Sequence, residues 1–244
     1  MLPIHEIDGR QLYYTFVAGA KKIFEQQHYL NKINVFPVTD GDTGSNMAIT
    51  IRSVIESIHP DRSFNVTANR IAETTMVNAR GNSGIIFSQF LYGISKEAAN
   101  HQKLTIPQFA TSIKNSVPYM YEAVAKPVEG TILTVIKDWS EFIYNQRNII
   151  TDFNQLFIRS KEVAEKSLLE TKQKLLVLAK ANVVDAGANA FVFFIEGIIE
   201  FIQENSIRKL LGSKTESVVM PDINDHITEE VKFRYCTEGI LKNL

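Results

Sequence analysis

The sequence predicts an all-α bundle of about eight helices, and three observations support this fold class. Apolar residues recur at helical spacing from residue 12 to residue 204. The segments between these stripes are short, as expected for antiparallel helices that are neighbours in a bundle. No segment before residue 215 alternates between polar and apolar residues in the way that indicates a strand. With 244 residues, 45% of them hydrophobic, the chain can form one large core or two modest ones.

The expected helices follow one another along the chain. The second ends before Pro60, which cannot continue a helix, and the fifth has Pro107 in its first turn, where proline is tolerated. Residues 152–180 are long enough for either one or two helices. The apolar stripes place the helices at 12–24, 47–58, 68–79, 86–98, 107–124, 132–143, 152–180 and 187–204.

The composition changes after Leu211, so the helical domain is expected to cover residues 1–211. Residues 212–226 are polar, contain Pro221 and are typical of a linker. Residues 230–235 alternate as a strand does. We therefore expect residues 227–244 to be the start of a truncated middle domain.

The bulk properties exclude several classes of protein. A formal net charge of -1, without a basic stripe, argues against nucleic-acid binding. A single cysteine, Cys236, cannot form an internal disulfide and is typical of a reducing compartment. The apolar run 188–202 looks too short to span a membrane and contains two glutamates, so it is interpreted as a core helix. The protein is expected to be cytoplasmic.

The segment Asn34–Met47 (NVFPVTDGDTGSNM) is the most informative part of the chain. Asp40 and Asp42 lie on a glycine-containing turn between apolar residues and an amphipathic helix. Carboxylates that converge in this way suit a hard cation such as Mg²⁺. The helix start that follows favours a phosphate group. Its residues are Thr43, Gly44, Ser45 and Asn46. A simple capped turn is about equally compatible with the pattern.

Three further junctions carry glycine. In NARGNSG, the residues Gly81, Asn82, Ser83 and Gly84 form either a phosphate-binding turn or an ordinary interhelical turn. In KPVEGT, Gly130 and Thr131 suit a turn and an N-cap, and Glu129 is interpreted as a solvated side chain.

In VVDAG, Asp185 is an N-cap by default and otherwise faces a ribose, a base or a metal. The four junctions lie about two helices apart, and loops with this spacing emerge at the same end of an up-and-down bundle. We therefore expect all four to meet at one rim.

The strings NVFPVTDGDTGSNM, NARGNSGIIFSQ, KPVEGTILTV and VVDAG resemble the N-terminal kinase domain of bacterial fatty acid kinase. That domain is similar to the nucleotide-binding subunit of dihydroxyacetone kinase. The resemblance covers about residues 8–205. It implies a barrel of eight antiparallel helices that holds ATP and two Mg²⁺ ions at one end.

By this resemblance Asp40 and Asp42 are metal ligands, and Asn34 is a third whose spacing differs by one residue from the related subunit. The phosphates would be held by residues 43–46 and 81–84, and Gly130, Thr131, Asp185, Ala186 and Gly187 would complete the nucleotide site. Arg80 is a candidate for stabilising transition-state charge, with a plain surface arginine as the alternative. Family members carry further glycines where this chain has Ala188 and Ala190.

The resemblance implies transfer of a phosphoryl group to a fatty acid, giving an acyl phosphate for phospholipid synthesis. The fatty acid would arrive on a separate fatty-acid-binding protein, and a homodimer is a further possibility for assembly. Two alternatives stay open: a dihydroxyacetone-type kinase subunit, and a non-catalytic nucleotide-binding module in which Ala188 and Ala190 have impaired the site.

Overall fold

The computed structural model describes residues 3–203 and confirms the all-α fold class. The predicted linker (212–226) and the predicted strand-like tail (227–244) lie outside the described residues. The long segment 152–180 forms two helices rather than one. Within the described range the helices are α1 (Gly9–Lys32), α2 (Thr43–Ser57), α3 (Phe64–Val77), α4 (Gly81–Glu97), α5 (Ile106–Glu122), α6 (Ile132–Gln146), α7 (Phe153–Lys174), α8 (Leu176–Ala181) and α9 (Ala186–Gln203).

Side-chain caps define where several helices begin. The Asp8 carboxylate accepts a hydrogen bond from the backbone N–H of Gln11, and the Gln11 side chain accepts one from the backbone N–H of Asp8, each at 2.9 Å. This reciprocal pair starts α1. Asp152 caps α7 in a simpler way, by accepting from the backbone N–H of Asn154 at 3.1 Å.

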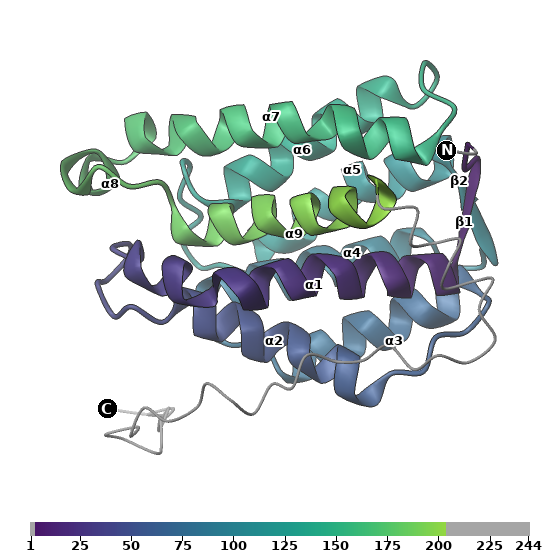
Figure 1. The fold of residues 1–244 in the computed structure, drawn as a ribbon, viewed down its shortest axis with the longest axis horizontal. Helices are drawn as coiled ribbons and strands as arrows, with labels where there is room; N and C mark the ends of the chain where they lie inside the picture. Colours follow the sequence, from purple (N-terminus) through teal and green to yellow (C-terminus); the bar gives the residue numbers. More distant parts are fainter. Residues whose placement is uncertain (1–2, 204–244) are drawn as a thin grey trace. The chain divides into compact units, whose positions relative to one another are not determined.

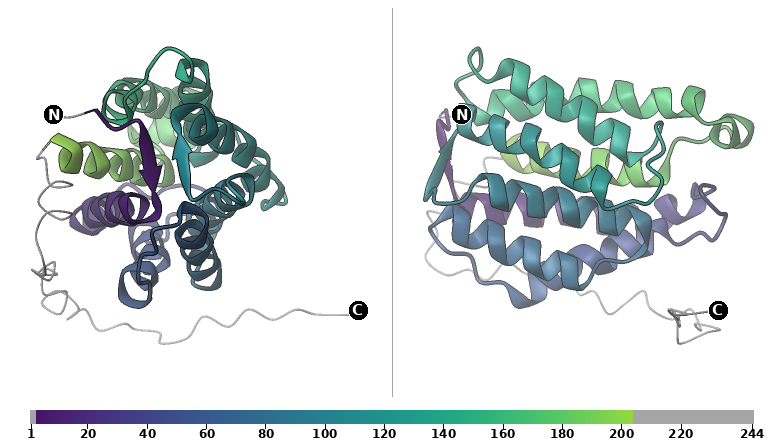
Figure 2. Two further views of the ribbon diagram at one scale, coloured as in Figure 1. Left: turned by 90° about the vertical axis from the view of Figure 1, so that its right-hand side faces the viewer. Right: turned by 180° about the vertical axis from the view of Figure 1, so that it is seen from behind.

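The long helices form an up-and-down ring around an apolar interior (Figures 1 and 2). Helix α1 packs on α2, consecutive helices pack from α3 to α7, and α9 closes the ring between α7 and α1. Aromatic rings fill the middle: Phe194 of α9 meets Phe16 and Phe87 edge-on, with centroid distances of 5.4 and 5.2 Å. The short helix α8 projects at one end of the ring (Figure 1).

Helix α9 is the core helix that the sequence predicted, but it is longer than the apolar run suggested. Its 18 residues are long and apolar enough to cross a membrane by length and composition, so the argument from length was wrong. Burial supports the interpretation as a core helix, because 72% of this 18-residue helix is buried inside the ring. Ala188 and Ala190 are both fully buried within it.

Two short strands were not predicted. Strand β1 (Glu6–Asp8) pairs antiparallel with β2 (Lys103–Thr105), with Ile7 opposite Leu104. Three residues are too few to show an alternation, which is why the sequence pattern missed them. The pair lies at the opposite end of the ring from α8 (Figure 1).

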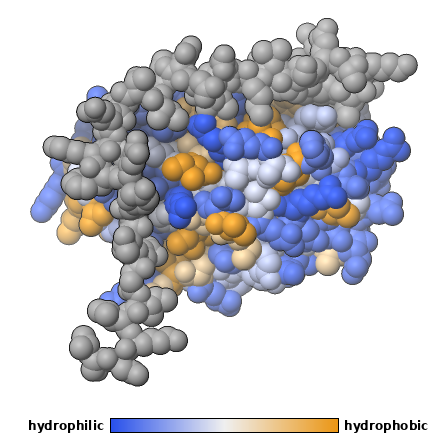
Figure 3. All heavy atoms as spheres, turned by 90° about the horizontal axis from the view of Figure 1, so that it is seen from below, coloured by the Kyte–Doolittle hydropathy of each residue, from blue (hydrophilic) through white to orange (hydrophobic). Residues whose placement is uncertain are grey.

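The outer surface is mixed. Apolar side chains lie among polar ones on the face formed by α2 and α3 (Figure 3). Exposed apolar residues on these two helices are Ile49, Met76 and Val77. Scattered exposure of this kind is normal for protein surfaces and does not itself identify a site.

Candidate functional site

The four glycine-bearing loops come together at the end of the ring where α8 projects (Figure 1). A Cβ built on Gly81 would lie 2.6 Å from the side-chain nitrogen of Asn46, which joins the first two loops. A Cβ on Gly187 would lie 2.4 Å from the Ser83 hydroxyl, which joins the second and fourth. The backbone N–H of Ile132 donates to the Asp185 carboxylate at 3.0 Å, which joins the third and fourth loops, so the predicted meeting at one rim is confirmed.

Asn34 organises the acidic turn. Its side chain is buried, and its Nδ2 donates to the Asp40 carboxylate at 2.7 Å and to the Val38 carbonyl at 3.1 Å. Its Oδ1 accepts a hydrogen bond from the Thr43 hydroxyl. Both polar atoms of Asn34 thus hold the turn together, and Gly41 allows the reversal with a φ of 67°.

Asp42 lies half-buried directly before α2, and its side chain makes no capping hydrogen bond. Burial raises the pKa of Asp42, the negative charge of Asp40 raises it further, and a hydrogen bond from Asn46 opposes the rise. A divalent cation would stabilise the charged form of a carboxylate that is buried beside another carboxylate in this way.

The donor set around this turn fits a cation that takes hard oxygen ligands and keeps part of its water. Among residues 3–203 no group of three or more His, Cys, Asp or Glu side chains is arranged to hold a metal. Asp40 and Asp42 supply two carboxylates, with the amide of Asn34 beside them. Mg²⁺ is commonly held by one or two carboxylates together with substrate phosphates, so two carboxylates are sufficient for it.

The start of α2 has fewer free donors than the sequence suggested. The backbone N–H of Ser45 donates to Oδ1 of Asn31 at 3.0 Å, and that of Asn46 donates to the Asp42 carbonyl at 2.8 Å. The Ser45 hydroxyl accepts from Asn31 and Gln27 of α1. These α1 residues were missed because nothing in the helical pattern distinguishes them.

Gly44 has a packing role that the sequence did not predict. It is buried, and a Cβ at this position would lie 2.2 Å from the backbone carbonyl oxygen of Gln27. Real Cβ atoms do not approach backbone this closely. Glycine is therefore needed for α2 to lie against α1, whatever part its N–H plays in binding a phosphate.

The second loop is fixed by α2. The backbone N–H of Arg80 donates to the Thr50 hydroxyl at 3.0 Å, and Gly81 has a φ of 60°. Gly84 is buried against the same threonine. The Arg80 side chain is exposed, and its role in stabilising transition-state charge stays a prediction.

A pocket of about 130 Å³ lies among the loops. Its walls are mostly apolar with a few polar groups, the usual make-up of a small-molecule site. The lining residues are Phe36, Pro37, Asn82, Ser83, Ile86, Val124, Lys126, Val128, Thr131, Ile132, Leu133 and Asp185.

The pocket selects among the predicted site residues. Four of them line it, namely Asn82, Ser83, Thr131 and Asp185. The carboxylates of the acidic turn do not, although Phe36 and Pro37 of the same loop do. Lys126 also lines the pocket, and nothing in the sequence pattern assigned it a role, although it belongs to the KPVEGT motif. A second cavity of about 100 Å³, inside the ring beside Trp139, contains none of the predicted residues.

Asp185 joins two helices. One carboxylate oxygen accepts from the backbone N–H of Ala188 at 2.8 Å, which caps α9, and from that of Ile132 at 3.0 Å, which starts α6. Its own N–H donates to Thr171 of α7. Burial raises the pKa of Asp185 to about 6, although the two backbone donors oppose this rise. The capping role is thus confirmed and extends to a second helix, while Ala186 and Gly187 are buried just behind it.

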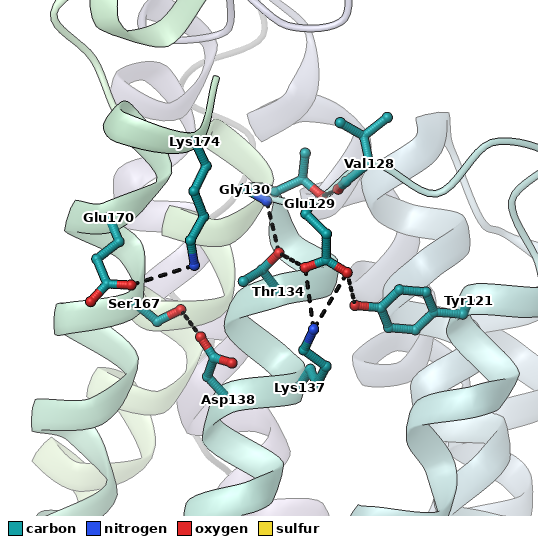
Figure 4. Close-up of polar contacts among 11 residues, drawn as sticks. Tyr121, Val128, Glu129, Gly130, Thr134, Lys137, Asp138, Ser167, Glu170 and Lys174 are labelled. Carbon is teal, nitrogen blue, oxygen red and sulfur yellow. Dashed lines mark hydrogen bonds and ion pairs between the residues drawn. The ribbon is translucent and has the colours of Figure 1, made fainter. Parts of the chain in front are cut away.

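Glu129 is solvent-exposed, as the sequence predicted, with 54% of its side chain accessible, but it is not isolated. Its carboxylate accepts from Tyr121 and Thr134 and pairs with Lys137 (Figure 4). The neighbouring Gly130 has a φ of 83°, and Thr131 donates its hydroxyl hydrogen bond to the Val128 carbonyl at 2.7 Å. The third loop is therefore an ordered turn.

The protein is a ring of antiparallel helices with a mostly apolar pocket among glycine-bearing loops at one end. A family model, the DAK2 domain, matches residues 37–200. The chain belongs to the DAK2 domain family.

The chain is also similar to longer bacterial proteins. The chain is 36% identical over 236 residues to the MG369 homolog of Mycoplasma pneumoniae, covering 92% of this chain and 42% of that protein. It is 31% identical over 257 residues to protein YloV of Bacillus subtilis, covering 99% and 45%. The chain thus spans less than half the length of these relatives.

The fold is similar to that of the dihydroxyacetone kinase from C. freundii, solved in complex with AMP-PNP and Mg²⁺. The TM-score is 0.60 at 17% sequence identity, over 82% of this chain and 35% of the kinase.

Proposed function

We propose that this chain is the nucleotide-binding part of an ATP-dependent kinase that uses Mg²⁺. The observation that carries the proposal is the meeting of a two-carboxylate turn and three glycine-bearing loops at one end of the helical ring. Membership of the DAK2 family supports it, and so does the similar kinase solved with AMP-PNP and Mg²⁺.

Each part of the rim has a distinct task in this proposal. The apolar pocket walls receive the base, and Asn82, Ser83 and Thr131 supply polar contacts. Asp40 and Asp42 hold Mg²⁺, which when bound offsets the charge of the phosphates. Thr43, Gly44 and the turn at Gly81 bring backbone donors towards the phosphates. Phosphoryl transfer depends mainly on such positioning and charge stabilisation.

The acceptor that we propose is the carboxylate of a fatty acid presented by a lipid-binding partner, with acyl phosphate as the product. A carboxylate with a pKa of about 4–5 is already ionised at neutral pH, so no general base is needed. A reaction that needs no general base agrees with the geometry of the rim, where the Asp185 carboxylate already accepts two backbone hydrogen bonds. We place the reaction in the cytoplasm.

A hydroxyl acceptor such as dihydroxyacetone is the second candidate, favoured by the named activity of the similar solved kinase. It would require activation of the hydroxyl by another part of the enzyme. The non-catalytic alternative assumed that Ala188 and Ala190 impair the nucleotide site. Both alanines are fully buried in α9 and neither lines the pocket, which argues against that assumption.

The nucleotide proposal is tested by calorimetric titration with ADP, with and without Mg²⁺. We expect binding that needs Mg²⁺ and that weakens at least about tenfold, or ~1.4 kcal/mol, in Asp42→Asn. Glu73→Gln is the matched control, because Glu73 is an exposed acid on α3. An unchanged affinity in Asp42→Asn, or binding indifferent to Mg²⁺, would contradict the metal assignment.

The acceptor is tested separately with the full-length kinase. Transfer of phosphate from ATP is measured to a fatty acid loaded on its carrier protein and, in parallel, to dihydroxyacetone. Phosphorylation of dihydroxyacetone alone would replace the first acceptor by the second.

A further inference from the structure

Glu129 lies at the centre of a hydrogen-bonded group that spans the third loop (Figure 4). We propose that Glu129 is a positioning residue: through Thr134 and Tyr121 it holds the 123–131 segment in the shape that forms one wall of the nucleotide pocket. This inference rests on the proposed nucleotide site and adds a determinant of its affinity.

The 123–131 segment is a substantial part of that wall. It connects the end of α5 to the start of α6, and four of the pocket's lining residues belong to it: Val124, Lys126, Val128 and Thr131. Neither regular helix fixes the backbone of this segment. Its first two residues, Ala123 and Val124, donate backbone hydrogen bonds to the Tyr121 carbonyl, and the rest of its shape comes from side-chain contacts and from the turn at Gly130.

The turn is fixed by a relay of two hydrogen bonds. The backbone N–H of Gly130, which is buried, donates to the Thr134 hydroxyl at 2.8 Å. That hydroxyl donates its single hydrogen to Oε2 of Glu129 at 2.6 Å. Without the carboxylate, the hydroxyl hydrogen loses its acceptor, and the orientation that receives the Gly130 N–H is no longer enforced.

The other carboxylate oxygen reaches the far end of the segment. Oε1 of Glu129 accepts from the Tyr121 hydroxyl at 2.8 Å, and Tyr121 lies at the end of α5. Lys137 of α6 pairs with the same carboxylate at 3.3 Å. One side chain thus joins both helices that bound the segment.

The electrostatics agree with an ionised acceptor and a neutral donor. Burial would raise the pKa of Glu129, but the hydrogen bonds from Thr134 and Tyr121 and the pairing with Lys137 lower it overall. Burial and the adjacent Glu129 both raise the pKa of Tyr121. At neutral pH the carboxylate is charged and the phenol keeps its proton, which is the arrangement that the hydrogen bonds require.

The position of Gly130 restricts how the segment can move. A Cβ on Gly130 would lie 2.6 Å from the Cβ of Lys174 on α7, so the turn fits closely against that helix. When the relay is removed, the turn no longer has one favoured position against α7. The fraction of molecules with a complete pocket wall falls, and the apparent affinity for a nucleotide falls in proportion.

The test is calorimetric titration of ADP and Mg²⁺ against the wild type, Glu129→Ala, Glu129→Gln and Thr134→Val. We expect Glu129→Ala to weaken binding by about 3- to 10-fold, and Glu129→Gln to weaken it less, because an amide oxygen can still accept one of the hydrogen bonds. Thermal unfolding without nucleotide is measured in parallel, so that a loss of fold is recognised.

Two controls distinguish positioning from general stabilisation. Glu141→Gln breaks a different glutamate–lysine pair, which joins Glu141 of α6 to Lys114 of α5, and Glu141 does not line the pocket. It is expected to leave the affinity for ADP unchanged. The double variant Glu129→Ala/Thr134→Val should bind about as well as the weaker single variant, because the two residues act through one relay.

The outcomes are distinct. A wild type that binds ADP while Glu129→Ala binds equally well overturns the positioning role and leaves the nucleotide site intact. Additive effects of Glu129→Ala and Thr134→Val overturn the relay. A wild type that binds no ADP contradicts the proposed nucleotide function itself.

Discussion

Asp185 allows a quantitative test of the way in which the loops are joined. Its carboxylate is buried, and burial raises its pKa from 3.8 to about 6. Because the folded state holds this proton more tightly than the unfolded state, the group favours folding below about pH 4, and that contribution is lost as the pH rises through about 6. Asp185→Asn removes the titration and keeps an oxygen that can accept both backbone hydrogen bonds.

The magnitude follows from the two pKa values. Between about pH 4.5 and about pH 7.5 the wild type should lose roughly 2 kcal/mol of unfolding free energy relative to Asp185→Asn. Asp185→Ala should instead be destabilised by about 2 kcal/mol or more at low pH, since two helix starts lose their cap.

The assay is urea unfolding of the three proteins at both pH values, followed by circular dichroism. Taking the difference between wild type and Asp185→Asn removes the contribution of all other titrating groups. A difference that stays constant with pH would show that the Asp185 carboxylate is not held in an environment that disfavours its charge, and the reasoning would fail.

Two further substitutions test the packing and the pocket. Gly44→Ala places a Cβ against the Gln27 carbonyl and should cost about 2–3 kcal/mol of unfolding free energy in a urea titration, with less than about 0.5 kcal/mol for Ser57→Ala on the same helix. Lys126→Met removes the cationic group of the pocket wall and should weaken ADP binding by about 5- to 30-fold in a calorimetric titration, with a smaller dependence on salt than in the wild type.

Each of these expectations has an outcome that contradicts it. If Gly44→Ala is as stable as the wild type, α1 and α2 can move apart without a loss of unfolding free energy, and the packing argument is wrong. For the lysine, the matched control is Lys166→Met, an exposed lysine on α7. Equal effects of the two lysine variants on ADP affinity would show that only the overall charge of the protein matters.

The sequence predicted the helices and the meeting of the loops because both depend on local patterns. Stripes such as that of α2 reflect a buried face with helical period, and loops two helices apart return to the same end of a bundle. Asp185 was recognised as a cap for the same reason, because capping is a contact within a few residues of the chain.

The contacts that complete the site cross between elements, and local patterns do not reveal them. Asn31 and Gln27 lie on α1 but hold the start of α2. The second hydrogen bond of Asp185 reaches Ile132, which is 53 residues away in sequence. Glu129 is exposed, as predicted, but its partners Tyr121 and Lys137 were missed because they lie eight residues away on either side, on two different helices.

The position of Trp139 has a practical consequence for studying this protein. It is the single tryptophan of the chain, and its ring is buried between Phe157 and Phe191, with centroid distances of 6.2 and 5.5 Å. Among the described residues its indole N–H has no hydrogen-bond partner. Trp139 lies about two turns along α6 from the pocket residue Ile132, so its intrinsic fluorescence reports on the interior of the ring next to the rim. Unfolding can therefore be followed optically without attaching any label.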